Sequence, residues 1–326
     1  MAGLKIVFGA ASFNPGGNFP TLDDARSVLN ILEQNDVRNL DTAQLYGESE
    51  SILGQLNAGD RFVIDTKSKG GWDAGNSLQP DNLYRLTHES LEKLKVKQVD
   101  VFYIHVPDDT VPPSTWVPTM DRLHKEGVFK RFGVSNFTGE EVKQVYEFAK
   151  ANNYVLPSVY QGNYSAVTRR SETELFPILR EYKMAFYAYS PIAGGFLSKT
   201  KAAVLDGTSA GRFTADGKPM SRMYRSLYMK PSLLEALDEW AVAADEEGVS
   251  KAELAYRWVN YHSYLKPEYG DAIIIGSRNT QQLVETVQGL KKGPLSDGVV
   301  EKIEKIWEKV KHEAPLDNFN SFLRLQ

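Results

Sequence analysis

Short apolar segments alternate with longer amphipathic segments along almost the whole chain. The short segments are nearly continuously apolar and rich in β-branched and aromatic residues, which is typical of strands buried on both faces of a parallel sheet. We predict strands over residues 4–10, 38–43, 62–67, 99–106, 131–136, 158–163, 184–190 and 272–277.

The segments between these strands carry apolar residues at helical spacing. The clearest helical patterns lie at residues 22–32, 81–95, 142–149, 254–258 and 299–310. Several follow the polar spacing of a helix-capping pair, namely Thr21 with Asp24, Thr138 with Glu141, and Ser250 with Glu253. Pro177 lies inside the helical pattern of 171–182, so we expect that helix to start late or to kink.

Eight strands alternating with helices favour a closed (β/α)8 TIM barrel, built as a single domain over residues 1–326. A doubly wound open sheet is the alternative, and it is less favoured because no GxGxxG motif follows the first predicted strand. Residues 191–231 form a long insert between the seventh strand and its helix. Loops of this length in a compact domain are usually functional or disordered.

The composition is that of an ordinary soluble protein, with 42% hydrophobic and 25% charged residues. The net charge of −4 argues against a nucleic-acid-binding protein, which would need a concentrated basic face. No apolar run is long enough to span a membrane, and the N-terminal segment does not resemble a secretory signal. The chain has no cysteine, which excludes disulfides and thiolate chemistry and fits a cytoplasmic location.

Titratable side chains gather at the predicted strand ends, where the active site of such a barrel lies. Asp41, Lys67 and His105 end three consecutive strands, and Tyr46 follows Asp41 in the next loop. We expect Asp41 to pair with Lys67, and the Lys67 ammonium to lower the pKa of the Tyr46 phenol. With a hydrogen bond from His105, this set would polarise a carbonyl group and protonate its oxygen. A reduction would then need a cofactor that supplies hydride.

Each of these residues also has an ordinary structural explanation when it is taken alone: a turn aspartate, a solvated lysine, a core histidine and a packed tyrosine. A lyase that uses Lys67 as a Schiff-base nucleophile is a second enzyme class. We expect no metal site, because the other histidines fall in predicted helices without HxH or HExxH spacing.

Seven segments occur in an order that resembles the aldo-keto reductase superfamily, and within it the aflatoxin-aldehyde reductase branch. They are LDTAQLYGESESILG, FVIDTK, VDVFYIHVPD, RFGVSNF, VYQGNYS, FYAYSPIAGGFLS and AIIIGSRNTQQLVET. The resemblance implies that Tyr46 donates the proton, with Asp41, Lys67 and His105 completing a catalytic tetrad. The implied reaction is the NADPH-dependent reduction of an aldehyde of aromatic, dicarbonyl or semialdehyde type. A non-catalytic NADPH-binding regulatory subunit is a further alternative, because some members of the superfamily have that role.

The resemblance also implies three groups of cofactor-binding residues. The nicotinamide would lie against Ser135, Asn136, Gln161 and Tyr189. The pyrophosphate would lie along Ser190, Pro191, Ile192, Gly194, Gly195 and Leu197. The adenosine end would face Arg212, Gly276, Ser277, Arg278, Gln282 and Glu285. Arg278 is the expected partner of a 2′-phosphate, whereas Glu285 departs from the asparagine that the family often has there and would bind the adenine amino group or repel a phosphate.

Candidate substrate residues come from the loops and from the C-terminal region. Phe13 and Trp72 are expected walls of a cup above His105, and Trp116 is either a further wall or helix core. Arg225 and Arg324 are candidate ligands for a carboxylate or a polar dicarbonyl, with Arg225 favoured because the branch has a matching YR element. The branch also suggests a homodimer.

Overall fold

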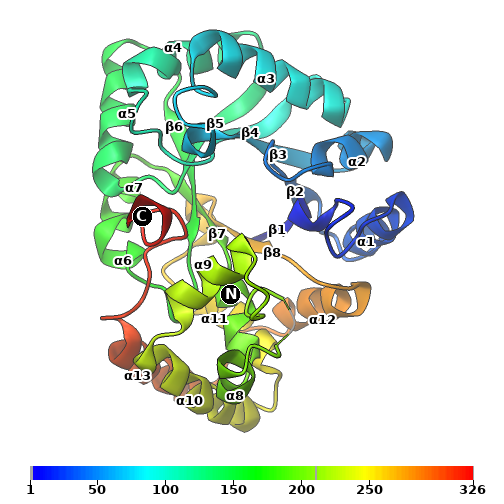
Figure 1. The fold of residues 1–326 in the computed structure, drawn as a ribbon, viewed down its shortest axis with the longest axis vertical. Helices are drawn as coiled ribbons and strands as arrows, with labels where there is room; N and C mark the ends of the chain where they lie inside the picture. Colours follow the sequence, from blue (N-terminus) through cyan, green and yellow to red (C-terminus); the bar gives the residue numbers. More distant parts are fainter. Residues whose placement is uncertain (1–2, 210, 326) are drawn as a thin grey trace.

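The computed structural model describes residues 3–209 and 211–325, and its strands close into a parallel barrel in chain order (Figure 1). The strands are β1 (Lys5–Gly9), β2 (Asn39–Asp41), β3 (Val63–Ser68), β4 (Val99–Ile104), β5 (Phe129–Ser135), β6 (Pro157–Asn163), β7 (Ala185–Tyr189) and β8 (Ala272–Ile275). Each strand begins and ends within two residues of its predicted range. The (β/α)8 TIM barrel is therefore confirmed, and the open sheet is excluded.

Closure follows from the pairing of the first strand with the last. Lys5 of β1 is in register with Ala272 of β8, and β8 in turn pairs with β7 through the same Ala272 and Tyr187. A closed barrel leaves no strand edge to pair with another chain. It also brings the carboxyl ends of all the strands to one mouth.

Helices cover the outside of this barrel. They are α1 (Leu22–Gln34), α2 (Ser49–Gln55), α3 (Pro80–Leu94), α4 (Pro113–Lys125), α5 (Gly139–Ala151), α6 (Ser171–Glu174), α7 (Phe176–Glu181), α8 (Lys201–Leu205), α9 (Pro219–Tyr228), α10 (Pro231–Glu247), α11 (Lys251–Tyr261), α12 (Thr280–Leu290) and α13 (Asp297–Val310). Short 3-10 helices are η1 (Ala10–Ser12), η2 (Ala58–Asp60), η3 (Gly70–Asp73), η4 (Ala193–Ser198), η5 (Pro267–Tyr269) and η6 (Leu323–Leu325). Within the described ranges, no helix combines the length and the apolar character needed to cross a membrane.

Local signals in the sequence account for several helix ends. Complete capping boxes begin α1 at Thr21 and α5 at Thr138. The expected interruption near Pro177 is confirmed, because Leu175 leaves helical geometry between α6 and α7 and the proline sits in the first turn of α7.

Apolar side chains form one layer between strands and helices and a second, smaller cluster inside the barrel. The inner cluster consists of Val7, Val101, Tyr103, Val159, Ala185, Tyr187, Ala272 and Ile274. Gly133 leaves space for it, because a Cβ at that position would overlap the ring of Tyr103. The interior is thus packed with side chains, so small molecules have access to the mouth rather than to a channel.

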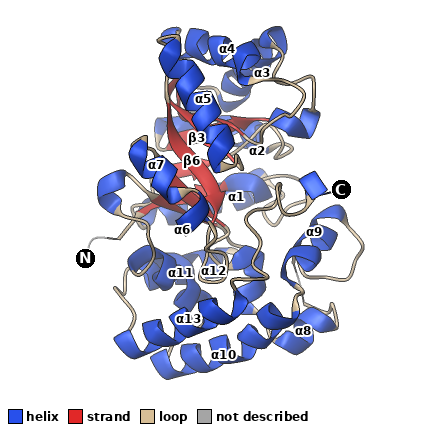
Figure 2. Ribbon diagram, turned by 90° about the vertical axis from the view of Figure 1, so that its left-hand side faces the viewer, coloured by secondary structure: helices blue, strands red, loops and turns tan. Residues whose placement is uncertain are grey.

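Two segments lie over the mouth. The insert at residues 191–231 contains η4, α8 and α9, so much of it is helical rather than loop. The chain after α13 returns to the barrel, where Asn320 donates from Nδ2 to the carbonyl oxygen of Asn136 at 3.0 Å. Figure 2 shows α9 and the C-terminus on the same side of the barrel, opposite to the N-terminus.

Candidate active site

A buried ion pair lies at the ends of β2 and β3. Lys67 Nζ donates to Asp41 Oδ1 at 2.7 Å, to Asp41 Oδ2 at 2.6 Å and to the carbonyl oxygen of Thr42 at 2.8 Å. Gln161 Nε2 adds a further hydrogen bond to Asp41 Oδ1 at 2.8 Å. Burial by itself would lower the pKa of Lys67, but the Asp41 carboxylate, assisted by Tyr46, raises it instead. The lysine is therefore held as an ammonium ion, and the expected pairing is present.

The phenol of Tyr46 lies beside this pair. The centroid of its ring is 5.1 Å from Lys67 Nζ and 5.7 Å from the centroid of the His105 ring. Burial raises the pKa of Tyr46, and the opposing effect of Lys67 is too small to reverse this. The expectation that Lys67 would bring the pKa below its usual value is therefore wrong for this structure, because it neglected burial. Tyr46 is a neutral phenol that carries a proton.

Hydrogen bonds behind the loop hold Tyr46 in place. Strand alternation turns Thr66 away from the barrel interior, and its hydroxyl donates to the buried Glu50 of α2 at 2.6 Å. Thr42 donates to Ser49 Oγ at 2.8 Å, and this hydroxyl donates to a carbonyl oxygen of η1 at 2.9 Å. These bonds tie α2, which follows Tyr46, to the strands that carry Asp41 and Lys67.

His105 follows β4 at the same mouth and is uncharged at neutral pH. Burial, and secondly the charge of Lys67, holds its pKa well below the usual value. Its Nδ1 is buried, and no described residue forms a hydrogen bond with it. A neutral imidazole can orient an oxygen atom through a hydrogen bond without adding charge.

Trp72 lies next to His105, and Phe319 lies next to Trp72. The ring of Trp72 is 6.5 Å from that of His105 and 6.0 Å from that of Phe319, measured between centroids. Trp72 is 41% exposed, so part of its ring faces the mouth. Phe319 was not among the sequence candidates, because the C-terminal segment has no periodic pattern that would place it over the barrel.

The candidate nicotinamide residues surround the tetrad. Asn136 adopts a positive φ of 61° and donates from Nδ2 to the carbonyl oxygen of His105 and to Ser135 Oγ, each at 3.0 Å. Its Oδ1 accepts from the hydroxyl of Tyr189 at 2.7 Å. Ser135, Asn136 and Tyr189 therefore form one hydrogen-bonded group next to His105. The fourth candidate, Gln161, is bonded to Asp41 instead.

The candidate pyrophosphate segment has an unusual backbone after β7. Ser190, Ala193, Gly194 and Gly195 all have positive φ values of 55°, 52°, 66° and 101°. A Cβ at Gly194 would overlap the ring of Tyr224, so the insert can approach the segment only because this residue is glycine. The other candidate pyrophosphate residues differ in solvent exposure: Pro191 and Leu197 are buried, and Ile192 is partly buried.

The candidate adenosine end collects positive charge. Burial lowers the pKa of Lys199, and the neighbouring cations Arg278 and Lys251 lower it further. Lys251 also donates to the carbonyl oxygen of Lys199 at 2.7 Å. Ser277 Oγ nearby in sequence is buried, and nothing in the described ranges hydrogen-bonds to it. Lys199 and Lys251 were missed because they come from the insert and from α11, whose proximity to Arg278 has no signal in the sequence.

The remaining adenosine candidates lie on or before α12. Gln282 Oε1 accepts from the backbone N–H of Arg278 at 3.2 Å, and Glu285 Oε1 accepts from Gln281 Nε2 at 2.9 Å. Gly276 precedes them, exposed and with open space at its Cβ position. All three residues are accessible to solvent. The side chains of Gln282 and Glu285 already have hydrogen-bond partners within their own segment.

Arg212 faces Tyr224 of α9 and donates to its hydroxyl, with its Cζ 4.6 Å from the ring centroid. The same hydroxyl lies 3.3 Å from Ser190 Oγ and accepts from Asn318 Nδ2 at 3.2 Å. Tyr224 thus joins the insert, the end of β7 and the C-terminal segment. Arg212 and Tyr224 are close enough to Tyr46 to influence its pKa.

Two aromatic substrate candidates, Phe13 and Trp116, do not line the mouth. Phe13 is 0% exposed, and its ring packs against those of Phe8 and Phe19 at centroid distances of 5.8 and 5.9 Å. Trp116 is likewise helix core, with its ring centroid 6.0 Å from that of Phe132. Phe13 was chosen for its place after the first strand, but the chain turns there and buries the ring.

Both candidate arginines have structural partners instead. Arg225 Nη1 donates to the carbonyl oxygens of Val204 and Phe213 at 2.8 and 3.0 Å, which fastens α8 and the segment before α9 to α9. Arg324 has the carboxylates of Asp109 and Glu141 as partners. Both guanidinium groups therefore bind other parts of the protein in this structure, and their role as substrate ligands stays a prediction.

Arg324 belongs to η6 and binds Asp109, Glu141 and Asn320. Its Nη2 lies 2.5 Å from Glu141 Oε1, its Nε donates to Asp109 Oδ2 at 3.1 Å, and its Nη1 donates to Asn320 Oδ1 at 2.8 Å. Because Glu141 also caps α5, Arg324 joins the C-terminal segment to the first turn of that helix.

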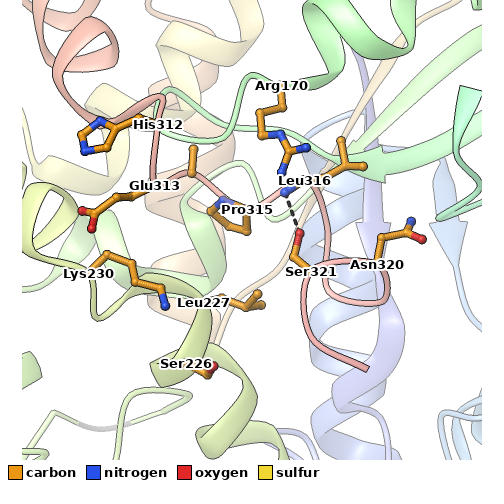
Figure 3. A pocket seen from close by; sticks show the side chains of 11 residues that line it. Arg170, Ser226, Leu227, Lys230, His312, Glu313, Pro315, Leu316, Asn320 and Ser321 are labelled. Carbon is orange, nitrogen blue, oxygen red and sulfur yellow. Dashed lines mark hydrogen bonds between the residues drawn. The ribbon is translucent and has the colours of Figure 1, made fainter. Parts of the chain in front are cut away.

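A cavity of ≈ 440 Å³ lies beside the mouth, between α9 and the C-terminal segment (Figure 3). Its lining includes Arg170, Lys230, His312 and Glu313, and none of the four tetrad residues. Arg170 is paired with Glu174 at 2.8 Å. The candidate catalytic residues therefore lie outside this cavity.

Known proteins are similar to this chain over most of its length. The model of the Aldo/keto reductase family matches residues 5–308. Oxidoreductase sirO from Leptosphaeria maculans is 38% identical over 322 residues, which cover 95% of each chain. Aflatoxin B1 aldehyde reductase member 2 from Homo sapiens is 39% identical over 306 residues, which cover 89% of this chain and 83% of that protein. Aldo-keto reductase family 7 member A3 from Homo sapiens is 39% identical over 324 residues, 95% of each.

Proposed function

The chain belongs to the aldo/keto reductase family and is an oxidoreductase, and from this premise we propose that it reduces aldehydes to alcohols with NADPH. Tyr46 is the proton donor in this proposal. The observation that carries it is the buried Lys67–Asp41 ion pair beside a neutral Tyr46 phenol and a neutral His105.

Each residue of the tetrad has a distinct task. NADPH, when bound, supplies the hydride. The Lys67 ammonium stabilises the negative charge that develops on the substrate oxygen, and Asp41 keeps that ammonium charged and in place. Tyr46 donates its proton to the oxygen, and His105 orients the oxygen with a hydrogen bond.

The residues at the adenosine end fit a phosphorylated dinucleotide. Arg278 and Lys251 lie close enough to Lys199 to lower its pKa, so positive charge gathers here and would attract a 2′-phosphate. The buried, unpartnered Ser277 Oγ offers a further polar contact. Both features support NADPH rather than NADH as the cofactor.

Aldehydes with an aromatic or polar substituent are the proposed substrates. Trp72 and Phe319 would supply the aromatic wall next to His105. The Schiff-base alternative is disfavoured because Lys67 is fully buried and its pKa is raised. The amine therefore stays protonated and lacks the lone pair that a nucleophile needs.

The test is NADPH oxidation with a reactive aromatic aldehyde, comparing the wild type with Tyr46→Phe. We expect the substitution to lower kcat by orders of magnitude, because the phenolic proton is lost, while NADPH affinity stays nearly unchanged. Activity retained by Tyr46→Phe would show that another group is the acid. NADPH binding by the wild type without turnover of any aldehyde would instead favour a non-catalytic, cofactor-binding role.

A further inference from the structure

A second buried carboxyl group lies directly below the tetrad. Asp65 is 1% exposed and precedes Lys67 by two residues on β3, so strand alternation places both side chains on the same face of the strand. Its Cα is in register with that of Asp41 on β2. The proposed reaction does not use this group, yet it is part of the same buried charge system.

The two carboxyl groups differ in how well they are satisfied. Asp41 accepts hydrogen bonds on both oxygens, from Lys67 and Gln161. Asp65 accepts one at Oδ1, from the backbone N–H of Val101 at 3.0 Å, and its buried Oδ2 has no partner in residues 3–209 and 211–325. When two carboxylates share a low-dielectric site, the less well solvated one takes up a proton first. That group is Asp65.

A second unpartnered polar group lies in the same barrel interior. The hydroxyl of Tyr103, on β4, is also buried without a partner in the described part of the chain. Asp65 is the first charged neighbour that affects the pKa of Tyr103, after burial itself. No described residue forms an ion pair with Asp65, so an ionised Asp65 would leave an uncompensated charge in the interior, whereas the protonated form is neutral.

Charged and titratable groups face Asp65 from most of the surrounding strands: Lys5 on β1, Asp41 on β2, Lys67 on β3, Asp100 and Tyr103 on β4, Arg131 on β5 and Tyr187 on β7. Strands β6 and β8 contribute Val159, Ala272 and Ile274 to the same interior. Burial, followed by the charges of Asp41 and Asp100, raises the pKa of Asp65 to about 7, against the opposite influence of Arg131 and Lys5. Asp65 therefore changes charge near neutral pH.

We propose that Asp65 is a positioning residue for the reduction, whose uptake and release of a proton sets the net charge behind Lys67 and thereby the rate of carbonyl reduction. The inference rests on the proposed aldehyde reductase function. With Asp65 protonated, only Asp41 compensates the Lys67 ammonium, and the developing oxyanion is stabilised. With Asp65 ionised, a second carboxylate cancels that charge, and the oxyanion loses stabilisation. Reduction therefore slows as the pH rises through about 7.

The experiment compares Asp65→Asn with the matched control Asp100→Asn. Asparagine keeps the Oδ1 acceptor for Val101 but cannot ionise. Asp100 is a partly buried carboxylate near the start of β4 that pairs with Arg131 and influences the pKa of Asp65. Aldehyde reduction is measured as kcat and kcat/KM between about pH 6 and about pH 8. We expect kcat of the wild type to fall about tenfold across this pH range. The kcat of Asp65→Asn should stay nearly constant, close to the value of the wild type at low pH.

In Asp100→Asn the rate of reduction should still fall with rising pH, but the fall should occur at lower pH, because the Asp100 carboxylate helps to raise the pKa of Asp65. The inference would be overturned if the pH–rate profile of Asp65→Asn followed that of the wild type. It would also be overturned if the profile of Asp100→Asn were as flat as the one expected for Asp65→Asn. A wild type without aldehyde turnover would instead refute the proposed function on which the inference rests.

A measurement without substitution covers the case in which Asp65→Asn does not fold. Carbon-13 NMR of wild-type protein labelled at the aspartate carboxyl carbons should show one buried aspartate that titrates near neutral pH, well above the range usual for aspartates. If every aspartate carboxyl has finished titrating below about pH 6, Asp65 is not the group that we infer, and the proposal fails.

Discussion

Lys67 shows how one side chain can be costly for stability and necessary for the site. A buried ammonium is tolerated only when it is paired and hydrogen-bonded, and here Asp41 and the Thr42 carbonyl oxygen meet that need. The same arrangement keeps the charge fixed next to Tyr46 before any substrate arrives. Such preorganisation is what makes a charge effective in stabilising a transition state.

Arg278 allows a test of cofactor choice by a single substitution. We expect Arg278→Ala to weaken NADPH binding by about tenfold and NADH binding much less, because a guanidinium forms charge-assisted bonds with a 2′-phosphate that NADH lacks. The measurement is the dissociation constant of each dinucleotide from fluorescence titration. The control is Arg26→Ala, which removes an exposed arginine of α1 paired with Asp23. Equal losses for the two dinucleotides would show that Arg278 does not distinguish them.

The segment after β7 illustrates how an element depends on backbone conformation rather than on helix or strand propensity. Its four residues with positive φ bend the chain at the end of β7, and two of them are not glycine. A bend of this kind lets backbone N–H groups approach an anion. Gly194 must also leave room for Tyr224 of α9, so the segment and the insert depend on each other.

Substitution of the two neighbouring glycines separates strain from crowding. Gly194→Ala introduces a positive-φ alanine and an overlap with Tyr224, whereas Gly195→Ala introduces the unfavourable φ with open space around its Cβ. We expect Gly195→Ala to cost about 1 kcal/mol in the free energy of unfolding and Gly194→Ala clearly more, with weaker NADPH binding. Denaturant unfolding and dinucleotide titration provide the two readouts. Equal losses for the two variants would mean that Tyr224 yields easily.

Segments that are distant in sequence lie together around the mouth of the barrel. Strand β4 brings His105, η3 brings Trp72 and the C-terminal segment brings Phe319. Arg324 anchors that last segment to Glu141 on α5 and to Asp109. The position of Phe319, and with it part of the proposed substrate site, therefore depends on these ion pairs of Arg324.

Loss of this anchor should affect substrate binding more than chemistry. We expect Arg324→Ala to raise KM for an aromatic aldehyde by about threefold to tenfold, with a small change in kcat and none in NADPH affinity, because Phe319 would lose its fixed position. Steady-state kinetics, with a melting temperature for each variant, would check this. Lys311→Ala, which removes an exposed pair with Glu308, serves as the control. An unchanged KM would show that Phe319 stays in place without the anchor.

Much of the fold was accessible from the order of residues alone. Strand positions, the capping boxes at Thr21 and Thr138, and the break near Pro177 all rest on local patterns, because burial on two faces and helix capping act over a few residues. Asp41, Lys67 and His105 were found in the same way, since a parallel barrel brings every strand's carboxyl end to one mouth.

Contacts between distant segments were decided only by the tertiary structure. Phe13 occupied a suitable place in the chain but turned into the core, and Arg225 and Arg324 found carbonyl and carboxylate partners far along the sequence. Phe319 came to the mouth from the C-terminal segment without any local signal. The charge state of Asp65 likewise follows from groups on five other strands. Periodicity is a property of neighbours in sequence, whereas burial and electrostatics sum over neighbours in space.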